Sequence, residues 1–211
     1  MLCGAVGQFD RHLRHVVDVL GLQPGMTQPF TLSVLVLPTG TYFIADPYVI
    51  QDPDAEQLAE MTIRSAEAVK RFGVEPKVAL LSHSNFGSSE SPSAEKMRVA
   101  RRLITARAPS LEVEGEMQAD LAFSSEIRQR IFPNSQLSGS ANLLILPNLD
   151  AANIAFNMVK ALGGGLAIGP TLCGVNKVAH IVTPSITVRG LVNMSAVAVY
   201  DAQVCGGRAC G

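Results

Sequence analysis

The sequence predicts an α/β fold, in which helices cover both faces of a sheet. Short β-rich runs alternate with helical segments of roughly 12 to 18 residues along most of the chain. Hydrophobic residues make up 47% of the 211 residues, enough for a buried core. The best-marked helix starts at Asp54, with acidic residues early, basic residues late and Gly73 as its stop.

The other expected elements follow in chain order. The runs 31–38 and 41–47 flank a Thr-Gly turn, which predicts an antiparallel hairpin at an edge of the sheet. Apolar runs predict buried strands, and segments bounded by proline or glycine predict helices. The strands are expected at 78–84, 143–147 and 178–183, and the helices at 93–109, 120–133, 149–165 and 185–200.

Composition narrows the class of partner. Seventeen basic and eighteen acidic residues give a net charge of −1, and only 5% of residues are aromatic, which argues against a nucleic-acid partner. No segment has the apolar length that spans a membrane, and the N-terminus does not resemble a signal peptide. The spacing of Cys3, Cys173, Cys205 and Cys210 indicates neither a disulfide framework nor a zinc site. We expect a cytoplasmic protein with reduced thiols and no bound metal.

In open α/β sheets, ligands lie beyond the carboxyl ends of the strands. SHSNFGSS (82–89) follows an expected strand and is either a ligand loop or a plain linker. In EGEMQAD, Glu116 and Asp120 either serve acid/base chemistry or favour a helix N-terminus through its dipole. Asn148 is expected to cap the helix that follows it.

The stretch HIVTPSITVRG (180–190) predicts a helix start after a strand. Thr183 occupies the expected N-cap position, and Pro184 the first helical position. Arg189 is a cation within two turns of this start, where the helix dipole favours an acid. Either Arg189 points into solvent, or it shares an anionic ligand with the N–H groups of residues 185–187.

Five segments carry a resemblance that covers residues 1 to about 203: DPDAEQLAEMTIRSAE, FGVEPKVALLSHSNFGSS, EVEGEMQAD, SGSANLLILPNLDAANIAFN and GPTLCGVNKVAHIV. They are similar to the C-terminal part of the phosphate acetyltransferase family, and more narrowly to the phosphotransacetylase-like domain of bacterial hybrid NADP-dependent malic enzymes. The malic-enzyme half, and the start of the acetyltransferase-like domain, are missing here.

The resemblance implies a two-lobed αβα sandwich like that of isocitrate and isopropylmalate dehydrogenases, with acetyl-CoA between the lobes. Residues 27–176 would form a larger lobe that carries the dimer contact. Residues 1–26 and 177–203 would belong to the second lobe, and residues 204–211 would be a disordered tail.

The catalytic positions implied by the resemblance are altered. Arg14 matches an arginine that binds the anionic substrate. The family has a Ser-Arg-Gly turn, with an aspartate seven residues after the serine. Counting from Asn176 places Thr183 at the serine, Pro184 at the arginine and Gly190 at the aspartate.

The function implied is therefore a regulatory domain of a malic enzyme, which binds acetyl-CoA as an allosteric effector and does not transfer the acetyl group. An active phosphate acetyltransferase, or a purely structural dimerisation domain, are the alternatives. We expect a homodimer or higher homo-oligomer, with NADP and a divalent metal only in the malic-enzyme half. The residues expected to bind acetyl-CoA or its anionic groups are Arg14, Ser84, Asn85, Asn142, Asn153, Thr183 and Arg189.

Overall fold

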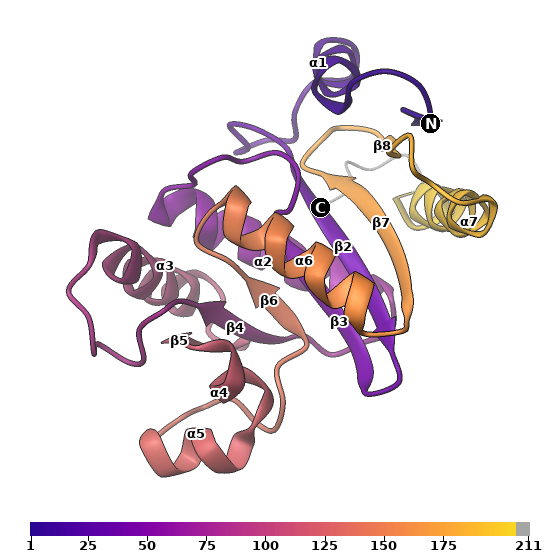
Figure 1. The fold of residues 1–211 in the computed structure, drawn as a ribbon. Coiled ribbons are helices and arrows are strands. Elements are labelled where there is room, and N and C mark those ends of the chain that lie inside the picture. The colour runs from indigo at the N-terminus through magenta and orange to yellow at the C-terminus, as the bar shows by residue number, and fades with distance from the viewer. Residues whose placement is uncertain (206–211) are drawn as a thin grey trace.

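The computed structural model describes residues 1–205, and its main feature is a mixed sheet of six strands (Figure 1). A second sheet of two strands lies beside it. The strands are β1 (Leu2–Cys3), β2 (Phe30–Leu37), β3 (Gly40–Ala45), β4 (Lys77–Leu81), β5 (Glu112–Met117), β6 (Leu143–Ile145), β7 (Leu166–Cys173) and β8 (His180–Ile181). The six-stranded sheet has the order β5-β4-β6-β3-β2-β7, and the small sheet pairs β1 with β8.

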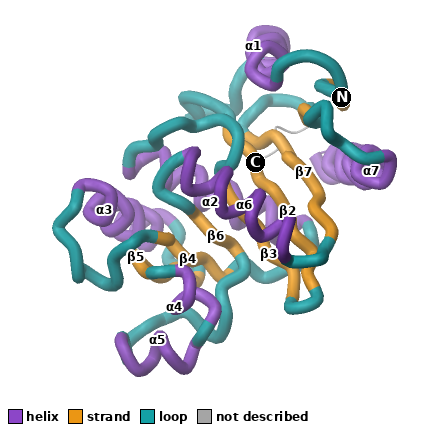
Figure 2. The backbone as a smooth tube through the Cα atoms, viewed as in Figure 1, coloured by secondary structure: helices purple, strands orange, loops and turns teal. Residues whose placement is uncertain are grey.

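Seven helices surround these sheets in the described part of the chain: α1 (Phe9–Leu20), α2 (Ala55–Arg71), α3 (Pro92–Arg107), α4 (Ala119–Phe123), α5 (Ser125–Ile131), α6 (Leu149–Leu162) and α7 (Val188–Cys205). Helices α2 and α3 pack on one face of the large sheet, and α4 and α6 pack on the other (Figure 2). The expected α/β class is confirmed.

The faces of the sheet follow from the alternation of side chains along its strands. On β3, Phe43 belongs to the hydrophobic cluster under α2 and α3, whereas Ile44 belongs to the cluster under α6. Helix α2 begins as predicted at Asp54, which accepts a hydrogen bond from the Gln57 amide, while the Gln57 side chain accepts from the Asp54 amide. This capping box fixes the start of the helix.

The hairpin of β2 and β3 is antiparallel as predicted, but its expected place at an edge of the sheet is wrong. Strand β3 also pairs in parallel with β6, and β2 also pairs with β7. The edge strands are β5 and β7. The physical reason is that residues 30–35 are buried on both faces, which suits an interior position.

Two predicted helices differ in detail. The helix expected at 120–133 divides into α4 and α5 because the Ser124 hydroxyl accepts the Ile127 amide and starts a new helix. Helix α7 begins at Val188, so Thr183 and Pro184 lie in the turn before it. Thr187 caps α7, since its hydroxyl accepts the Gly190 amide at 3.0 Å.

Residues from both ends of the chain form a third hydrophobic cluster. Strand β1 pairs in parallel with β8, and Val16 of α1 packs with Ile181 and with Leu172 of β7. Gln23 links the segment between α1 and β2 to the segment after β7. Its backbone amide donates to the Gly174 carbonyl, and its side chain donates to the Val175 carbonyl. The division at residues 26 and 176 stays a prediction.

The end of the chain is helical further than expected. Helix α7 runs to Cys205, so residues 204 and 205 of the expected tail are helical. Residues 206–211 lie outside the described part of the chain. None of the helices in residues 1–205 combines the length and the apolar character needed to cross a membrane.

Arg128 gives a test of this packing. Its guanidinium is fully buried and donates to the carbonyl oxygens of Leu121 and Leu137 and to the Ser135 hydroxyl, which ties α4 and α5 to the segment before β6. Arg128→Met leaves these acceptors without a partner, so we expect a loss of about 3 kcal/mol in the free energy of unfolding. Urea unfolding measures it.

Arg130→Met is the matched control, because Arg130 lies on the same helix with its side chain 74% exposed. We expect this change to stay within about 0.5 kcal/mol. Equal losses in the two variants would contradict the structural role of Arg128.

Candidate ligand-binding site

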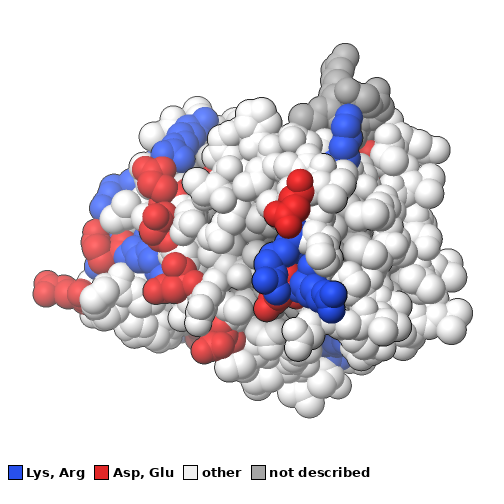
Figure 3. Space-filling model, turned by 90° about the horizontal axis from the view of Figure 1, so that it is seen from above, with Lys and Arg blue, Asp and Glu red and all other residues white. Residues whose placement is uncertain are grey.

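The strands β3, β6, β4 and β5 run parallel, so the loops that follow them lie together at the carboxyl ends of these strands. This side of the sheet is called the candidate edge. These loops contain Asp46, Ser84, Gln118 and Asn148. Such an edge is the usual place for a ligand in an open α/β sheet. Figure 3 views the molecule from above this edge: charged side chains gather on the α3 side and in a central group, while the α7 side is largely uncharged.

The loop 82–89 is held by one buried carboxylate, that of Glu116 on β5. The Oε1 atom of Glu116 accepts the Ser84 hydroxyl at 2.6 Å, the Gly87 amide at 2.9 Å and the Arg98 guanidinium at 2.9 Å. The Glu116 side chain is fully buried, and its Oε2 atom has no hydrogen-bond partner within the described residues. One oxygen therefore organises the loop and joins it to α3.

Further bonds fasten the same loop to the strand end after Glu116. The Asn85 side chain accepts the Gln118 amide at 2.7 Å, and the Gln118 side chain donates to the His83 carbonyl. Phe86 has a φ of 49° and stacks on Phe132, with ring centroids 4.2 Å apart. These contacts hold the loop in one conformation, and it exposes His83, Gly87 and Ser88.

These contacts decide between the alternatives for EGEMQAD. Glu116 is enclosed and engaged by three donors, so it lacks the access that an acid/base catalyst needs. Asp120 lies in the first turn of α4, where its carboxylate accepts the Leu121 amide. The helix-dipole interpretation fits Asp120, whereas Glu116 fits neither alternative, because it lies on β5 and holds the loop 82–89.

Asp46 organises the loop after β3. Its carboxylate accepts the amides of Thr31, Tyr48, Val49 and Ile50, together with the Thr31 hydroxyl. Burial raises the pKa of Asp46, while these hydrogen bonds oppose the rise.

Tyr48 connects this loop to the segment at the start of the chain. Its ring stacks on Phe9 of α1, with centroids 5.5 Å apart, and meets Phe156 of α6 edge-on at 6.2 Å. Burial raises the pKa of Tyr48. The contact places α1 beside the candidate edge, as Figure 1 shows.

Helix α6 also begins at this edge. Asn148 caps it as predicted, by accepting the Ala151 amide at 2.9 Å. Asn153 donates to the Pro47 carbonyl at 3.0 Å and accepts from Asn157. Ser84, Asn85 and Asn153 thus all belong to elements of the candidate edge, although their polar groups largely serve the loops themselves.

The expected residues of the second lobe lie on the surface. Arg14 and Arg189 are exposed and make no hydrogen bond or ion pair within the described residues. The Thr183 hydroxyl lies 3.1 Å from the Ser185 hydroxyl. Pro184 is exposed, and Gly190 lies in the first turn of α7. Arg189 is exposed, and both alternatives for it, solvent or a shared anion, stay predictions.

Asn142 lies apart from the other residues expected at the ligand site, and its expected part in binding stays a prediction. Its side chain accepts the Lys77 amide at 2.7 Å and donates to the Glu75 carbonyl at 2.8 Å. These contacts lie at the amino ends of β4 and β6, opposite the candidate edge. Asn142 fixes the entry of β4.

Among the described residues, no group of three or more His, Cys, Asp or Glu side chains lies close enough together to hold a metal ion. Cys3 and Cys173 are free thiols. Burial raises the pKa of Cys173 to about 12, so this thiol stays protonated near neutral pH.

Two contributions escaped the sequence analysis: the loop-holding role of Glu116, and the contact of Phe9 with Tyr48. A signal for the second exists, since Phe9, Leu13 and Val17 follow helical spacing in α1. The sequence offers no comparable signal for Glu116, because the same acid at a strand end also fits an exposed position.

A mixed sheet with ordered loops at one edge and a small sheet beside it defines an α/β domain of the class that holds ligands at the carboxyl ends of its strands. The family model described as phosphate acetyl/butaryl transferase matches residues 1–199. The chain belongs to this family.

The curated relatives are of two kinds. The chain is 49% identical over 204 residues to the NADP-dependent malic enzyme of Escherichia coli, and 48% identical over 203 residues to the NAD-dependent malic enzyme of Rhizobium meliloti. These matches cover 96% of this chain and 27% and 26% of the enzymes. The phosphate acetyltransferase of Paracoccus denitrificans is 37% identical, over 95% of this chain and 65% of that enzyme. The chain thus spans about a quarter of the malic enzymes it matches.

Solved structures give the same relationship. A phosphotransacetylase from Streptococcus pyogenes matches with a TM-score of 0.92 and 30% identity, over 97% of this chain and 63% of that one. The EutD phosphotransacetylase from Staphylococcus aureus matches with a TM-score of 0.87 and 28% identity, over 95% and 62%. The fold is that of a phosphotransacetylase; the likeness to isocitrate dehydrogenase stays a prediction.

The loop 82–89 provides a test of its buried carboxylate. Glu116→Gln replaces three charge-assisted hydrogen bonds by weaker ones, so we expect a loss of about 2 kcal/mol in the free energy of unfolding. We also expect faster hydrogen exchange at the Gly87 amide. Glu95→Gln is the control, since Glu95 contacts the same Arg98 from an exposed position. If both variants left exchange at Gly87 unchanged, Glu116 would not hold the loop.

Proposed function

We propose that this chain is the phosphotransacetylase-like part of a bacterial malic enzyme, and that it binds acetyl-CoA without transferring the acetyl group at an appreciable rate. One observation carries the proposal. By the resemblance, counted from Asn176, the positions of the serine, arginine and aspartate of the acetyltransferases hold Thr183, Pro184 and Gly190. The Thr183 hydroxyl contacts the Ser185 hydroxyl, and has no hydrogen bond to a titratable side chain among the described residues.

Acetyl transfer from CoA to phosphate needs a base that manages the thiol proton, and cations that stabilise phosphate and the developing oxyanion. Proline supplies no charge, and glycine supplies no carboxylate. Loss of one such group typically lowers the rate about 100-fold to 1000-fold, and groups that act together fail together. The stretch 183–190 thus favours binding over turnover.

Binding requires less of the protein. Glu116 holds the loop 82–89 through the Ser84 hydroxyl and the Gly87 amide. The N-termini of α3 and α6 follow strands that end on the same side of the sheet, where amide groups favour anionic ligands. Arg14 and Arg189 add exposed cations on the neighbouring elements. These features support a site for the phosphates and the pantetheine arm of acetyl-CoA.

A regulatory role would follow if acetyl-CoA bound two conformations of the complete protein with different affinity. In that arrangement, NADP and a divalent metal belong to the malic-enzyme half, and a second copy of the chain contacts the larger lobe. Occupation of this domain would then change malic-enzyme activity without any chemistry of its own.

Binding is measured by calorimetry with acetyl-CoA, on the 211-residue chain and on the longest reading frame that contains it. We expect saturable binding, a higher melting temperature, and lower malic-enzyme activity in the longer protein. Absence of heat and of a thermal shift at millimolar acetyl-CoA in both proteins would favour a purely structural domain and would end the proposal.

Transfer is measured with acetyl phosphate and CoA. We expect a rate at least roughly 1000-fold below that of an active phosphate acetyltransferase. Robust turnover would show that this chain is an enzyme with relocated catalytic residues.

A double substitution tests whether the missing arginine and aspartate account for the expected loss of acetyl transfer. Pro184→Arg combined with Gly190→Asp restores the cation and the acid, and we expect measurable acetyl transfer. A side chain fits at Gly190 after small shifts, because its Cβ would meet only side-chain atoms of Ile186 and Thr187, at 3.0 and 3.3 Å. Ser185→Arg with Gly190→Asp is the control, since it places the cation one residue away. If neither double variant transferred acetyl groups, other missing catalytic residues would also have to be restored.

A further inference from the structure

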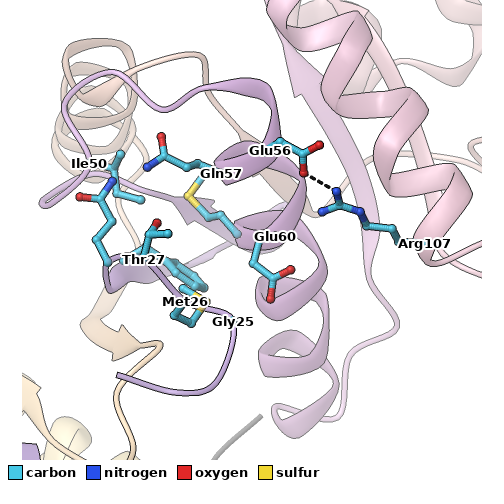
Figure 4. A pocket seen from close by; sticks show the side chains of 11 residues that line it. Gly25, Met26, Thr27, Ile50, Glu56, Gln57, Glu60 and Arg107 are labelled. Carbon is cyan, nitrogen blue, oxygen red and sulfur yellow. Dashed lines mark hydrogen bonds and ion pairs between the residues drawn. The ribbon is translucent and has the colours of Figure 1, made fainter. Parts of the chain in front are cut away.

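A separate pocket of about 150 Å³ lies beside the first turns of α2, away from the loop 82–89. Residues 25–28, in the segment that leads from α1 into β2, form one wall. Glu56, Gln57, Glu60 and Met61 of α2 form the opposite wall, and Arg107 closes one side from the end of α3 (Figure 4).

The base of this pocket is apolar. Phe30, Ile50 and Met61 are buried residues of the main hydrophobic cluster, and each also lines the pocket. Met26 packs against the same cluster from the opposite wall. Two thioethers and an aromatic ring therefore line one small space, and both groups make favourable contacts with an aromatic ring.

The rim carries polar groups with spare capacity. Arg64 occupies Oε1 of Glu60 at 2.8 Å, whereas Oε2 of Glu60 has no hydrogen bond within residues 1–205. The side chains of Thr27 and Gln28 likewise make no hydrogen bond in that range. In Figure 4, Glu60 points toward the segment that carries Met26, and Glu56 pairs with Arg107.

We propose that this pocket binds a planar aromatic ring that bears an amino group, of the adenine class. A cavity of about 150 Å³ holds one aromatic ring. The free carboxylate oxygen of Glu60 accepts a hydrogen bond from the exocyclic amine, and Gln28 offers both a donor and an acceptor to the ring nitrogens. The sugar of a nucleoside extends outward, because the pocket accommodates only the base.

The charges of the lining restrict the ligand further. Glu56 pairs with Arg107, and Glu60 pairs with Arg64, so the one cation among the lining residues is already engaged. This arrangement leaves no free cation to hold a phosphate inside the pocket. The ring therefore comes either from a free nucleoside or from the adenine end of a long ligand such as acetyl-CoA. The pocket stands on its own geometry and does not depend on the function proposed above.

Adenosine and inosine provide the direct test, because they differ at the amino group that Glu60 would bind. In a titration of the 211-residue chain followed by NMR, we expect adenosine to shift the methyl signals of Met26 and Met61. We expect inosine to bind about tenfold more weakly, since it has a carbonyl in place of the amine. No shift at millimolar adenosine, or equal affinity for the two nucleosides, would overturn the proposal.

Variants locate the contact. Glu60→Gln should weaken adenosine binding about tenfold, because its one remaining acceptor stays with Arg64. Glu67→Gln, an equal charge change at an exposed position of α2, should have no effect. Gln28→Trp places a large side chain in the pocket, so it should abolish adenosine binding. Thermal unfolding of this variant checks that it still folds. Unchanged affinity in both Glu60→Gln and Gln28→Trp would refute the site.

Acetyl-CoA forms the last arm of the experiment. Shifts at Met26 and Met61 with both ligands would assign the pocket to the adenine of acetyl-CoA, and shifts with adenosine alone would assign it to a free nucleoside. Either result supports the pocket. Acetyl-CoA binding with no effect of either ligand on these methionines would refute the pocket and leave the proposed function intact.

Discussion

The candidate edge of the sheet depends on the burial of the Glu116 carboxylate between β5 and the loop 82–89. A carboxylate removed from water is costly unless donors surround it. Here the hydroxyl of Ser84, the amide of Gly87 and the guanidinium of Arg98 supply those donors. Because each donor comes from a different position, satisfying the charge fixes the loop and the start of α3 together.

The neighbouring acid on β5 obeys the same constraint. Glu114 is fully buried, pairs with Arg101 of α3 at 2.9 Å, and accepts the Gln136 amide at 2.9 Å. Alternate residues of this edge strand thus bind the same helix through successive arginines. The two ion pairs hold α3 against the end strand β5, on the face of the sheet that α3 shares with α2.

Local sequence signals predicted the parts of the fold that local interactions determine. The box of Asp54 and Gln57, the cap at Asn148 and the hairpin between β2 and β3 needed only neighbouring residues. Place within the sheet depends on distant pairing, so the hairpin was expected at the edge although β6 and β7 enclose it. The same limit applies to Asn142, whose partners lie 65 and 67 residues away in the sequence.

The candidate site shows the same division. The polar residues of the loop 82–89 predict a ligand loop or a linker, but they do not predict that the Ser84 hydroxyl donates to the buried Glu116. The start of α7 was misplaced because two cap signals compete, Thr183 before a proline and Thr187 four residues later. Thr187 prevails because its hydroxyl reaches the Gly190 amide, whereas the Thr183 hydroxyl contacts Ser185. Thr183 therefore belongs to a turn that ends before the helix begins, and its hydroxyl is not held in place by helix capping.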